Sequence, residues 1–447
     1  MNPHVLKLAE AVRDAGGRAM LVGGCVRDRL IGIESKDLDL EVYGVDPARL
    51  RGILKQLGQV NTVGEHFSVY KLVVRNESSD LDRVEIDVSI PRRESKSGRG
   101  HRGFLIEGDP TMTLEEAARR RDFTINAILY DPLTDDTVDP FGGRTDLENQ
   151  LLKAVDAGTF IEDSLRVLRA VQLAARFELT LDPETAELCR SIDLSDIPHE
   201  RVWGEFEKLL MLAERPSIGL SVALELRVLD KLFPELSTLV GRQFCHTAED
   251  AFEHTKRSLD EEAKASADLT KAKRLTVMLA TLCHDLSTDS QTRLEATLSV
   301  LKKLGIYSVE GYDVRSHVLS LLRGQSVPHK FYESRASTTD GDFRRLAQNV
   351  ELDLLYRVTK ACGLAQDGGE SAIAAAGWFI ERARALGVEH EPAEPLLQGR
   401  HLLDAGVEPG PEMGRLLKRV YELQLDGEVT TREQALSAAL RIRDSNS

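Results

Sequence analysis

The sequence has little of what marks secreted, disulfide-bonded or membrane-spanning chains. Its 447 residues include only five cysteines, widely scattered and without a CxxC pair. This argues against a disulfide framework and a zinc knot, and it predicts reduced thiols. No apolar run approaches the roughly 18 to 20 residues that span a bilayer, and residues 1–17 read as a charged amphipathic helix rather than a secretion signal. We therefore expect a cytoplasmic protein without a membrane partner.

Positively charged residues are also outnumbered by negatively charged ones. The chain has 58 Lys and Arg against 73 Asp and Glu, which gives a net charge of -15. This balance disfavours non-specific binding to duplex nucleic acid, although a local basic patch can act within an acidic protein. One such patch lies at residues 92–102, where five Lys or Arg accompany a single Glu.

What is present is an ordinary folded composition, 42% hydrophobic and 29% charged. In the first 150 residues, β-branched residues and period-two alternation predict four strands, at 18–24, 36–42, 67–74 and 83–90. Further on, apolar residues spaced three and four apart predict helices, at 159–177, 200–214 and 274–286. Thr159 and Glu162 form a capping-box pattern at the start of the first helix. Residues 324–342 and 387–395 read as linkers.

Two carboxylates, Asp37 and Asp39, fall on one face of the strand predicted at 36–42, because successive strand side chains alternate. Side by side they repel, which a solvated edge tolerates and divalent cations relieve. On the strand predicted at 83–90, Asp87 faces away from the apolar side and could stand on a neighbouring strand beside the pair. Three converging carboxylates suit two-metal nucleotidyl transfer, and an all-oxygen donor set favours Mg²⁺ over zinc.

Other polar groups suggest a nucleotide site. Gly23 and Gly24 lie between a strand and a short helix, where backbone N–H groups approach a phosphate closely and Arg27 adds charge. A plain strand-to-helix turn would look the same. Asp122 and Asn126 share a face if a helix begins there, next to a run of arginines; the alternative is a solvated basic turn.

These motifs resemble, in their order, the bacterial class II CCA-adding enzymes, which are tRNA nucleotidyltransferases, and the related poly(A) polymerases. The resembling strings are LVGGCVRDRLIG, DLDLEV, EIDVSIPRRESKSGRG, RRRDFTINAILYD, DPFGG, EDSLRVLRAVQLAARF, HERVWGEFEKLL and PGPEMGRLLKRVYELQLDGEVTTREQAL. The resemblance implies an α+β fold, with a polymerase-beta-like nucleotidyltransferase head on a mixed β-sheet, followed by an all-α neck, body and tail. We expect a head at 1–145, a base-selecting neck at 146–212, a body at 213–385 and a tRNA-binding tail at 386–447.

The resemblance also implies residue roles. Asp37 and Asp39 would hold the catalytic Mg²⁺ ions, with Asp87 as the third carboxylate. Gly23, Gly24 and Arg27 would contact the triphosphate. The remaining nucleotide-binding residues would be Arg121, Asp122, Asn126, Asp163, Arg166 and Arg169.

Asp163, Arg166 and Arg169 recur every three residues, so on one helix they share a face while Leu165 and Leu168 turn toward the core. A surface ion-pair ladder would give the same pattern. In the family, the matching Asp and Arg read the incoming base. Cytosine and adenine each present an amino donor beside a ring-nitrogen acceptor, which a carboxylate and a guanidinium can pair, whereas uracil and guanine reverse that order.

The stretch at 92–102 is too polar to be buried and reads as a solvent loop. In the family, a flexible loop at this place helps the switch from adding C to adding A, which favours a complete CCA-adding or an A-adding enzyme.

His254, His284 and Asp285 resemble the HD phosphohydrolase domain of some family members. Those members continue as HDLGK and supply further histidines, whereas this chain reads HDLSTDSQTRLEATL, and Cys362 stands where they supply a late Asp. We expect a vestigial site without hydrolase activity.

The expected function is template-independent addition of CMP and AMP to the 3′ end of tRNA, using CTP and ATP and releasing pyrophosphate. A poly(A) polymerase or an A-adding specialist is the nearest alternative. The others are an HD metal-dependent phosphohydrolase and a catalytically silent RNA-binding protein. The oligomeric state stays open.

Overall fold

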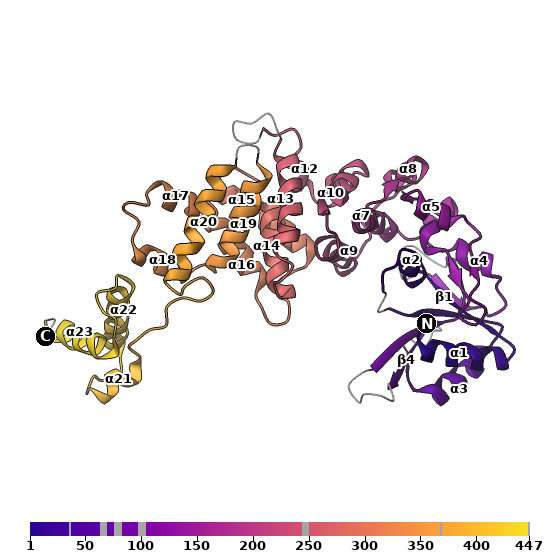
Figure 1. The fold of residues 1–447 in the computed structure, drawn as a ribbon, viewed down its shortest axis with the longest axis horizontal. Helices are drawn as coiled ribbons and strands as arrows, with labels where there is room; N and C mark the ends of the chain where they lie inside the picture. The colour runs from indigo at the N-terminus through magenta and orange to yellow at the C-terminus, as the bar shows by residue number, and fades with distance from the viewer. Residues whose placement is uncertain are drawn as a thin grey trace. The chain divides into compact units, whose positions relative to one another are not determined.

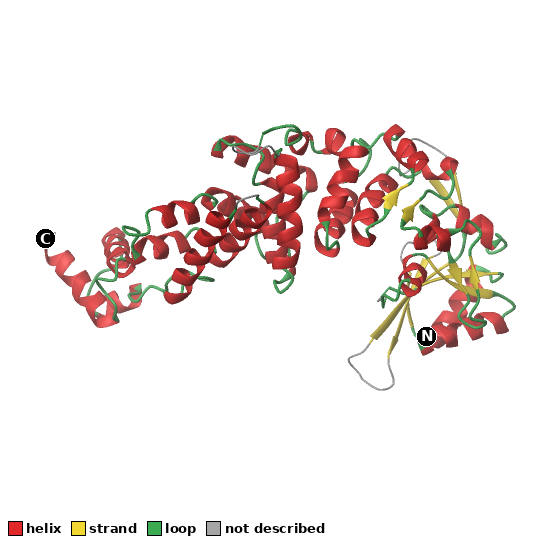
Figure 2. Cartoon of the chain, turned by 45° about the horizontal axis from the view of Figure 1, so that its top comes forward, coloured by secondary structure: helices red, strands yellow, loops and turns green. Residues whose placement is uncertain are grey.

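The computed structural model describes residues 1–34, 37–62, 69–75, 83–96, 104–243, 250–366 and 369–445. The chain divides into two units: Met1–Pro198 with Glu225–Val228, and His199–Leu224 with Leu229–Ser447. In the described residues, every strand lies in the first unit and the second unit is helical (Figure 2). The α+β class and the change from sheet to helices are therefore confirmed, while the four domain boundaries stay a prediction. Within the described ranges, no helix is long and apolar enough to cross a membrane.

A seven-stranded mixed sheet forms the centre of the first unit, in the order β3-β4-β5-β2-β1-β8-β9. The strands are β1 (Arg18–Val22), β2 (Asp39–Tyr43), β3 (Gln59–Thr62), β4 (Val69–Arg75), β5 (Arg83–Ser89), β8 (Leu129–Tyr130) and β9 (Thr137–Val138). Strands β2 and β5 run parallel, and the other neighbours are antiparallel. The four predicted strands correspond to β1, β2, β4 and β5. The sequence analysis missed β3, β8 and β9, which are too short to show a clear alternation.

The alternation gives the sheet two apolar faces. On one face, Leu40, Ile86 and Val88 are fully buried in a cluster with α1 (Pro3–Asp14) and α3 (Pro47–Leu57), which lie side by side (Figure 1). On the other face, Tyr43 packs with Ala118 of α4 (Leu114–Arg119). Burial on both faces fixes the strand register, since a slip of one residue would expose a whole apolar row.

The segment after the sheet corrects one prediction. It contains α5 (Gly143–Glu148), α6 (Ala157–Phe160), α7 (Leu165–Phe177), α8 (Pro183–Ser191) and a parallel pair, β10 (Leu151–Leu152) and β11 (Thr180–Leu181). The capping box at Thr159 and Glu162 is wrong, because Asp156 caps α6 by accepting from the Thr159 N–H. Phe160 is fully buried against Phe123, with ring centroids 5.5 Å apart, and the chain turns there before α7 begins.

The basic stretch at 92–102 begins as a strand rather than a loop. Strands β6 (Arg92–Lys96) and β7 (Phe104–Gly108) pair antiparallel as a separate hairpin. The rest of the predicted loop, residues 97–102, lies outside the described residues.

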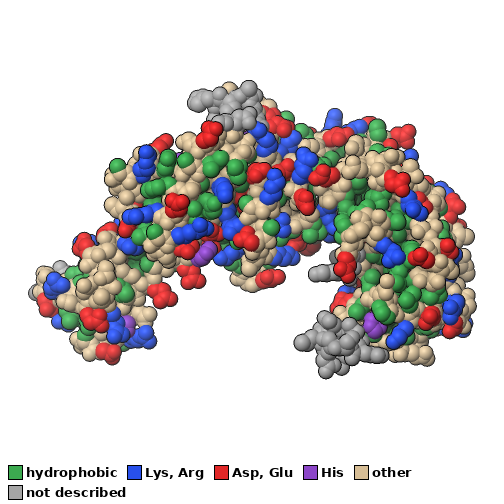
Figure 3. Space-filling model, viewed as in Figure 1, with side chains coloured by type: hydrophobic (Ala, Val, Ile, Leu, Met, Phe, Trp, Pro, Cys, Tyr) green, Lys and Arg blue, Asp and Glu red, His purple; other side chains and the backbone are tan. Residues whose placement is uncertain are grey.

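The helices that follow are α9 (His199–Leu212), α10 (Pro216–Glu225), α11 (Val228–Leu232), α12 (Pro234–Ser237), α13 (Ala251–Ala265), α14 (Lys271–Cys283), α15 (Ser290–Leu304), α16 (Val314–Gly324), α17 (Val327–Glu333), α18 (Asp340–Ala347), α19 (Leu352–Ala365), α20 (Glu370–Ala385), α21 (Gly399–Asp404), α22 (Pro411–Leu425) and α23 (Arg432–Ser445). The predicted helices at 200–214 and 274–286 correspond to α9 and α14. A linker at 324–342 is wrong, because α17 occupies it, whereas residues 387–395 contain no helix. On the face shown in Figure 3, acidic and basic side chains are interspersed over the helices of the second unit.

Candidate active site

Strand register brings two of the predicted carboxylates together. Strands β2 and β5 are parallel neighbours, and Asp39 lies opposite Asp87 in their pairing. The backbone N–H of Asp87 donates to the carbonyl of Leu38 at 2.9 Å, which holds the two strand ends in this register. Asp37 lies just before β2 and is exposed. The alternation read from the sequence therefore places Asp87 on the strand beside Asp39, as predicted.

A cavity of about 430 Å³ opens in front of these carboxylates. Five of the predicted site residues line it: Asp39, Asp87, Arg121, Asp163 and Arg166. The predicted residues Asp37, Gly24, Arg27, Asp122, Asn126 and Arg169 are not among its lining residues. One cavity thus joins the carboxylates of the sheet to the Asp and Arg near the start of α7.

The electrostatics of Asp39 fit a bound divalent cation. Burial raises the pKa of Asp39; the Arg121 guanidinium opposes this shift, and the charges of Asp87 and Asp37 add to it. A cation would relieve this crowding of negative charge, and the available donors are carboxylate oxygens. The donor set therefore fits a hard divalent metal ion.

The backbone beside Asp39 and Arg121 requires a glycine at position 23. Gly23 has a φ of +74°, a left-handed conformation that disfavours a side chain. A Cβ at this position would lie 3.0 Å from Nη1 of Arg121 and 3.9 Å from Oδ2 of Asp39. Gly23 therefore lets the backbone come close to the residues that line the cavity.

A second group of predicted residues forms an internal network. Nη1 of Arg27 donates to Oδ1 of Asn126 at 2.7 Å, and Nε of Arg27 donates to Oδ1 of Asp28 at 2.9 Å. Nδ2 of Asn126 in turn donates to Oδ1 of Asp122 at 3.0 Å, and Nε of Arg169 donates to Oδ2 of Asp122 at 2.6 Å. Asp122 and Asn126 do meet, although a 3-10 turn, Thr124–Asn126, carries them rather than an α-helix.

Burial alone would raise the pKa of Asp122, but Arg169 and the hydrogen bonds from Asn126 and the Phe123 N–H hold it below its usual value. In this structure Asp122 therefore pairs with Arg169 and Asn126 inside the protein.

The predicted base-reading pair is fixed by the backbone. Asp163 precedes α7, and its Oδ1 accepts from the N–H of Leu165 at 3.1 Å. Nη1 of Arg166 donates to the carbonyl of Thr159 at 2.9 Å, and Nη2 donates to that of Arg120 at 2.6 Å. The prediction that Asp163 shares a helical face with Arg166 is therefore wrong, because Asp163 lies before the helix. Asp163 and Arg166 nevertheless line one cavity.

Besides Arg92, which begins the predicted basic stretch, sequence reasoning left four polar residues of the cavity lining out of the site: Glu41, Ser89, Arg120 and Glu162. The signal for two of them was available, because Glu41 follows Asp39 and Ser89 follows Asp87 at the same period of two. Arg120 and Glu162 lie in turns, where no period indicates which way a side chain points.

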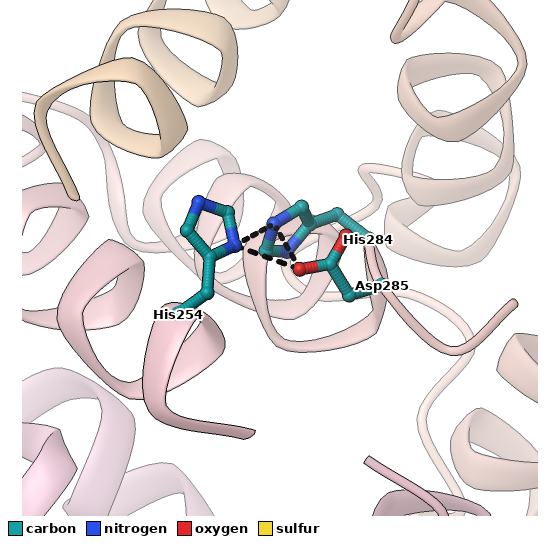
Figure 4. Close-up of side chains that lie close together, drawn as sticks. All are labelled: His254, His284 and Asp285. Carbon is teal, nitrogen blue, oxygen red and sulfur yellow. Dashed lines mark hydrogen bonds and ion pairs between the residues drawn. The ribbon is translucent and has the colours of Figure 1, made fainter. Parts of the chain in front are cut away.

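A different cluster lies in the helical unit. His254 on α13, with His284 and Asp285 directly after α14, brings three ligand atoms within 4.8 Å of one another. Nδ1 of His254 lies 2.7 Å from Oδ2 of Asp285, and Nε2 of His284 lies 3.1 Å from the same oxygen (Figure 4). Across the part of the chain that is described, Asp37, Asp39 and Asp87 do not meet this spacing.

Backbone carbonyls orient both imidazole rings. Nδ1 of His284 donates to the carbonyl of Thr281 at 2.6 Å, and Nε2 of His254 donates to that of Cys362 at 3.2 Å. Because a carbonyl only accepts, each ring carries a proton on that nitrogen and turns its other nitrogen toward the cluster. Two ring nitrogens and a carboxylate facing one point fit a divalent cation of borderline softness.

The cluster opens on a cavity of about 290 Å³, whose lining includes Cys362 and His329. Burial would lower the pKa of His284, but the side chains of Asp285 and Cys362 hold it well above its usual value. The sequence analysis did not connect His329 with the HD pair. This histidine lies on α17, inside the stretch read as a linker.

Residues 19–153 match the family described as the poly A polymerase head domain, and residues 178–239 match a probable RNA- and SrmB-binding site of polymerase A. A multifunctional CCA protein of Stenotrophomonas maltophilia is 38% identical over 278 residues, which is 60% of this chain and 63% of that protein. The chain thus spans less than two thirds of that relative's length. A multifunctional CCA protein of Xanthomonas campestris pv. campestris is 31% identical over 424 residues, which is 89% of this chain and 95% of that protein.

The fold has a solved counterpart. The crystal structure of the Bacillus stearothermophilus CCA-adding enzyme in complex with CTP matches with a TM-score of 0.65 at 21% identity, over 100% of both chains. The shared fold is a polymerase-beta-like head followed by helices. Because the likeness to the Xanthomonas protein extends over nearly the whole length of both chains, this chain belongs to the family of the bacterial CCA-adding enzymes and poly(A) polymerases.

Proposed function

We propose that this chain adds CMP and AMP, as the CCA end, to the 3′ end of tRNA from CTP and ATP and releases pyrophosphate. The observation that carries the proposal is the single cavity lined both by Asp39 and Asp87 and by Asp163 and Arg166. A transferase that selects its nucleotide without a template needs its reactive phosphate and its base reader in one space. The relatives named as CCA proteins support the same activity.

In this proposal each group of residues has its own task. Asp163 accepts from the amino group of cytosine or adenine, and Arg166 donates to the ring nitrogen beside it. Fixed by two backbone carbonyls, Arg166 keeps this geometry in the absence of substrate. Gly24, Arg27, Arg121, Asp122, Asn126 and Arg169 bind the sugar and phosphates. To bind the nucleotide, the buried residues of this set must break one of their hydrogen bonds within the protein and form one to the nucleotide instead.

Asp37, Asp39 and Asp87 would hold the divalent cations, and we propose Mg²⁺ because only carboxylate oxygens are offered. Such ions supply an activated 3′-hydroxyl and charge neutralisation on the pyrophosphate. The 3′-hydroxyl of the tRNA loses its proton to solvent and attacks the α-phosphorus; a new P–O bond forms, and the bond to pyrophosphate breaks. Since its substrates are tRNA, CTP and ATP, we also propose that the protein works in the cytoplasm.

The test is a gel-resolved extension assay. Transcripts ending before CCA, at C and at CC are incubated with each nucleotide alone and with CTP and ATP together. We expect CTP alone to add two residues to the shortest transcript, and ATP alone to extend only the transcript that ends in CC. A poly(A) polymerase would instead add a run of A to all three transcripts, and a silent RNA-binding protein would extend none.

A second candidate function is divalent metal binding by His254, His284 and Asp285 in the helical unit. The specific observation in its favour is the orientation of both rings by backbone carbonyls. In the Asp39→Ala background, which removes a head ligand, we expect about one Zn²⁺ per chain after dialysis. His254→Gln should remove that ion, whereas the control His390→Gln should keep it. Absence of bound metal from the Asp39→Ala protein would contradict the proposal. If that protein has a phosphatase activity that the further change Asp285→Ala removes, the site is not vestigial.

A further inference from the structure

We propose that Glu41 and Tyr43 form a positioning pair that holds Arg121 in place for a phosphate of the incoming nucleoside triphosphate. The inference rests on the nucleotidyl transfer proposed above and adds two residues to it. In this account neither Glu41 nor Tyr43 touches the reacting atoms, and both act through Arg121.

The three residues Asp39, Glu41 and Tyr43 project from one face of β2, because strand side chains alternate. The row runs from the cavity into the core: Glu41 lines the cavity with a side chain only 12% exposed, and Tyr43 is buried against the apolar cluster under α4. Glu41 lies in the middle of the sheet, between Met20 of β1 and Ser89 of β5. A carboxylate at this depth needs partners for its charge.

Glu41 finds those partners on both sides. The hydroxyl of Tyr43 donates to Oε2 of Glu41 at 2.5 Å, and Nη2 of Arg121 lies 3.8 Å from the same oxygen. Tyr43 is held by core packing, so its hydroxyl reaches Glu41 from a rigid base. Tyr43 therefore sets the position of the carboxylate, and the carboxylate sets that of the guanidinium.

Its neighbours restrict the position of the Arg121 guanidinium, but they do not pair with all of its donors. Its Nη1 lies close to the backbone at Gly23, and its charge acts on Asp39. Its Nε, by contrast, is buried and has no hydrogen-bond partner among the described residues. A guanidinium fork pairs with two oxygens of a phosphate, which would satisfy such a donor. We infer that Glu41 keeps Arg121 ready for the nucleotide and away from a direct bond with Asp39.

The experiment compares Glu41→Gln, Tyr43→Phe, Arg121→Ala and the double variant Glu41→Gln/Arg121→Ala. Equilibrium binding of CTP is measured without tRNA, so that no chemistry occurs, and KM and kcat are measured on a transcript lacking CCA. We expect Glu41→Gln to raise Kd and KM for CTP about tenfold, and Tyr43→Phe about threefold, with kcat nearly unchanged. In the Arg121→Ala background, Glu41→Gln should add no further loss, because its effect passes through that arginine.

The matched control is Tyr70→Phe, a buried tyrosine on the opposite face of the same sheet, which should leave Kd and KM at parental values. Losses in Glu41→Gln and Arg121→Ala that multiply in the double variant would overturn the inference. A higher Mg²⁺ requirement with a lower kcat in Glu41→Gln would also overturn it and would make Glu41 a metal ligand. Failure of the parent to extend tRNA would instead count against the proposed function. Tyr43→Phe provides a milder readout if Glu41→Gln does not fold.

Discussion

The head and the helical unit each gather charged side chains at one place, but by different means. In the head, carboxylates on neighbouring strands stand at a cavity of about 430 Å³, with arginines in its walls. In the helical unit, two imidazoles and a carboxylate lie within 4.8 Å of one another; both imidazoles are almost fully buried and the carboxylate is partly buried. Sheet register brings the first set together, and backbone carbonyls aim the second.

This contrast teaches what each site has room for. Asp37, Asp39 and Asp87 do not all lie within 4.8 Å of one another, and Asp39 and Asp87 line a cavity of about 430 Å³. The helical cluster is already within the distances that ligands of one ion take from each other. Spacing and burial, rather than residue type alone, therefore separate a reaction site from an ion site in this molecule.

The largest expected effect comes from the head. Asp87→Asn keeps the size of the side chain but removes a cation ligand, so we expect kcat/KM for CMP transfer to fall about a thousandfold. Glu85→Gln, two residues away on the same face of β5, is the matched control, because Glu85 is exposed and pairs with Lys71. Equal losses in both variants would indicate general damage to the strand and would remove the distinction between them.

A smaller effect is expected for the base reader. Replacing Asp163 and Arg166 with alanine removes two hydrogen bonds to C and A, so the preference for CTP over UTP should shrink roughly ten- to hundredfold. Residual transfer should persist, because the carboxylates of the sheet stay intact. The measurement is kcat/KM for all four nucleotides, with circular dichroism as a check on folding. Arg176→Ala, on the same helix, is the control, and an unchanged ratio of CTP to UTP use would refute the assignment.

The smallest effect concerns stability in the helical unit. Burial raises the pKa of Glu262, on α13, to about 8; Arg357 opposes the shift and Asp353 adds to it. A raised folded pKa means that the folded state binds the proton more tightly, so this group stabilises the fold at low pH and loses that contribution as pH rises toward 8.

Glu262→Gln should therefore raise the free energy of unfolding by about 1 to 3 kcal/mol at pH 7, with a smaller gain at pH 5. Thermal unfolding of both proteins across this pH range measures it. A larger gain at pH 5 than at pH 7 would contradict the raised pKa. This prediction extends the comparison, because the head carboxylates face a cavity whereas both oxygens of Glu262 have no partner among the described residues.

Strand alternation was enough to predict four of the seven strands of the head sheet, β1, β2, β4 and β5. It placed Val84, Ile86 and Val88 opposite Asp87, and the structure has Ile86 and Val88 fully buried while Asp87 is exposed. The same reasoning could have found Glu41. It could not find Arg120 or Glu162, because the direction of a side chain in a turn depends on packing that no local period records.

Other features depend on contacts far apart in the sequence. The carbonyl that orients His254 belongs to Cys362, 108 residues away. The start of α7 was misplaced because the burial of Phe160 against Phe123 outweighs a local capping pattern. Arg27 looked like a free cation, but it donates to Asp28 and Asn126 in the folded chain.

The most direct test of this account measures CMP transfer in Asp39→Ala and Asp285→Ala side by side, together with tRNA binding. We predict that Asp39→Ala abolishes transfer while tRNA binding survives, because this carboxylate serves the chemistry. Asp285→Ala should transfer CMP at the parental rate, because its cluster belongs to the other unit. Transfer by Asp39→Ala within a few-fold of the parent, or loss of transfer in Asp285→Ala, would contradict the assignment of the reaction to the head.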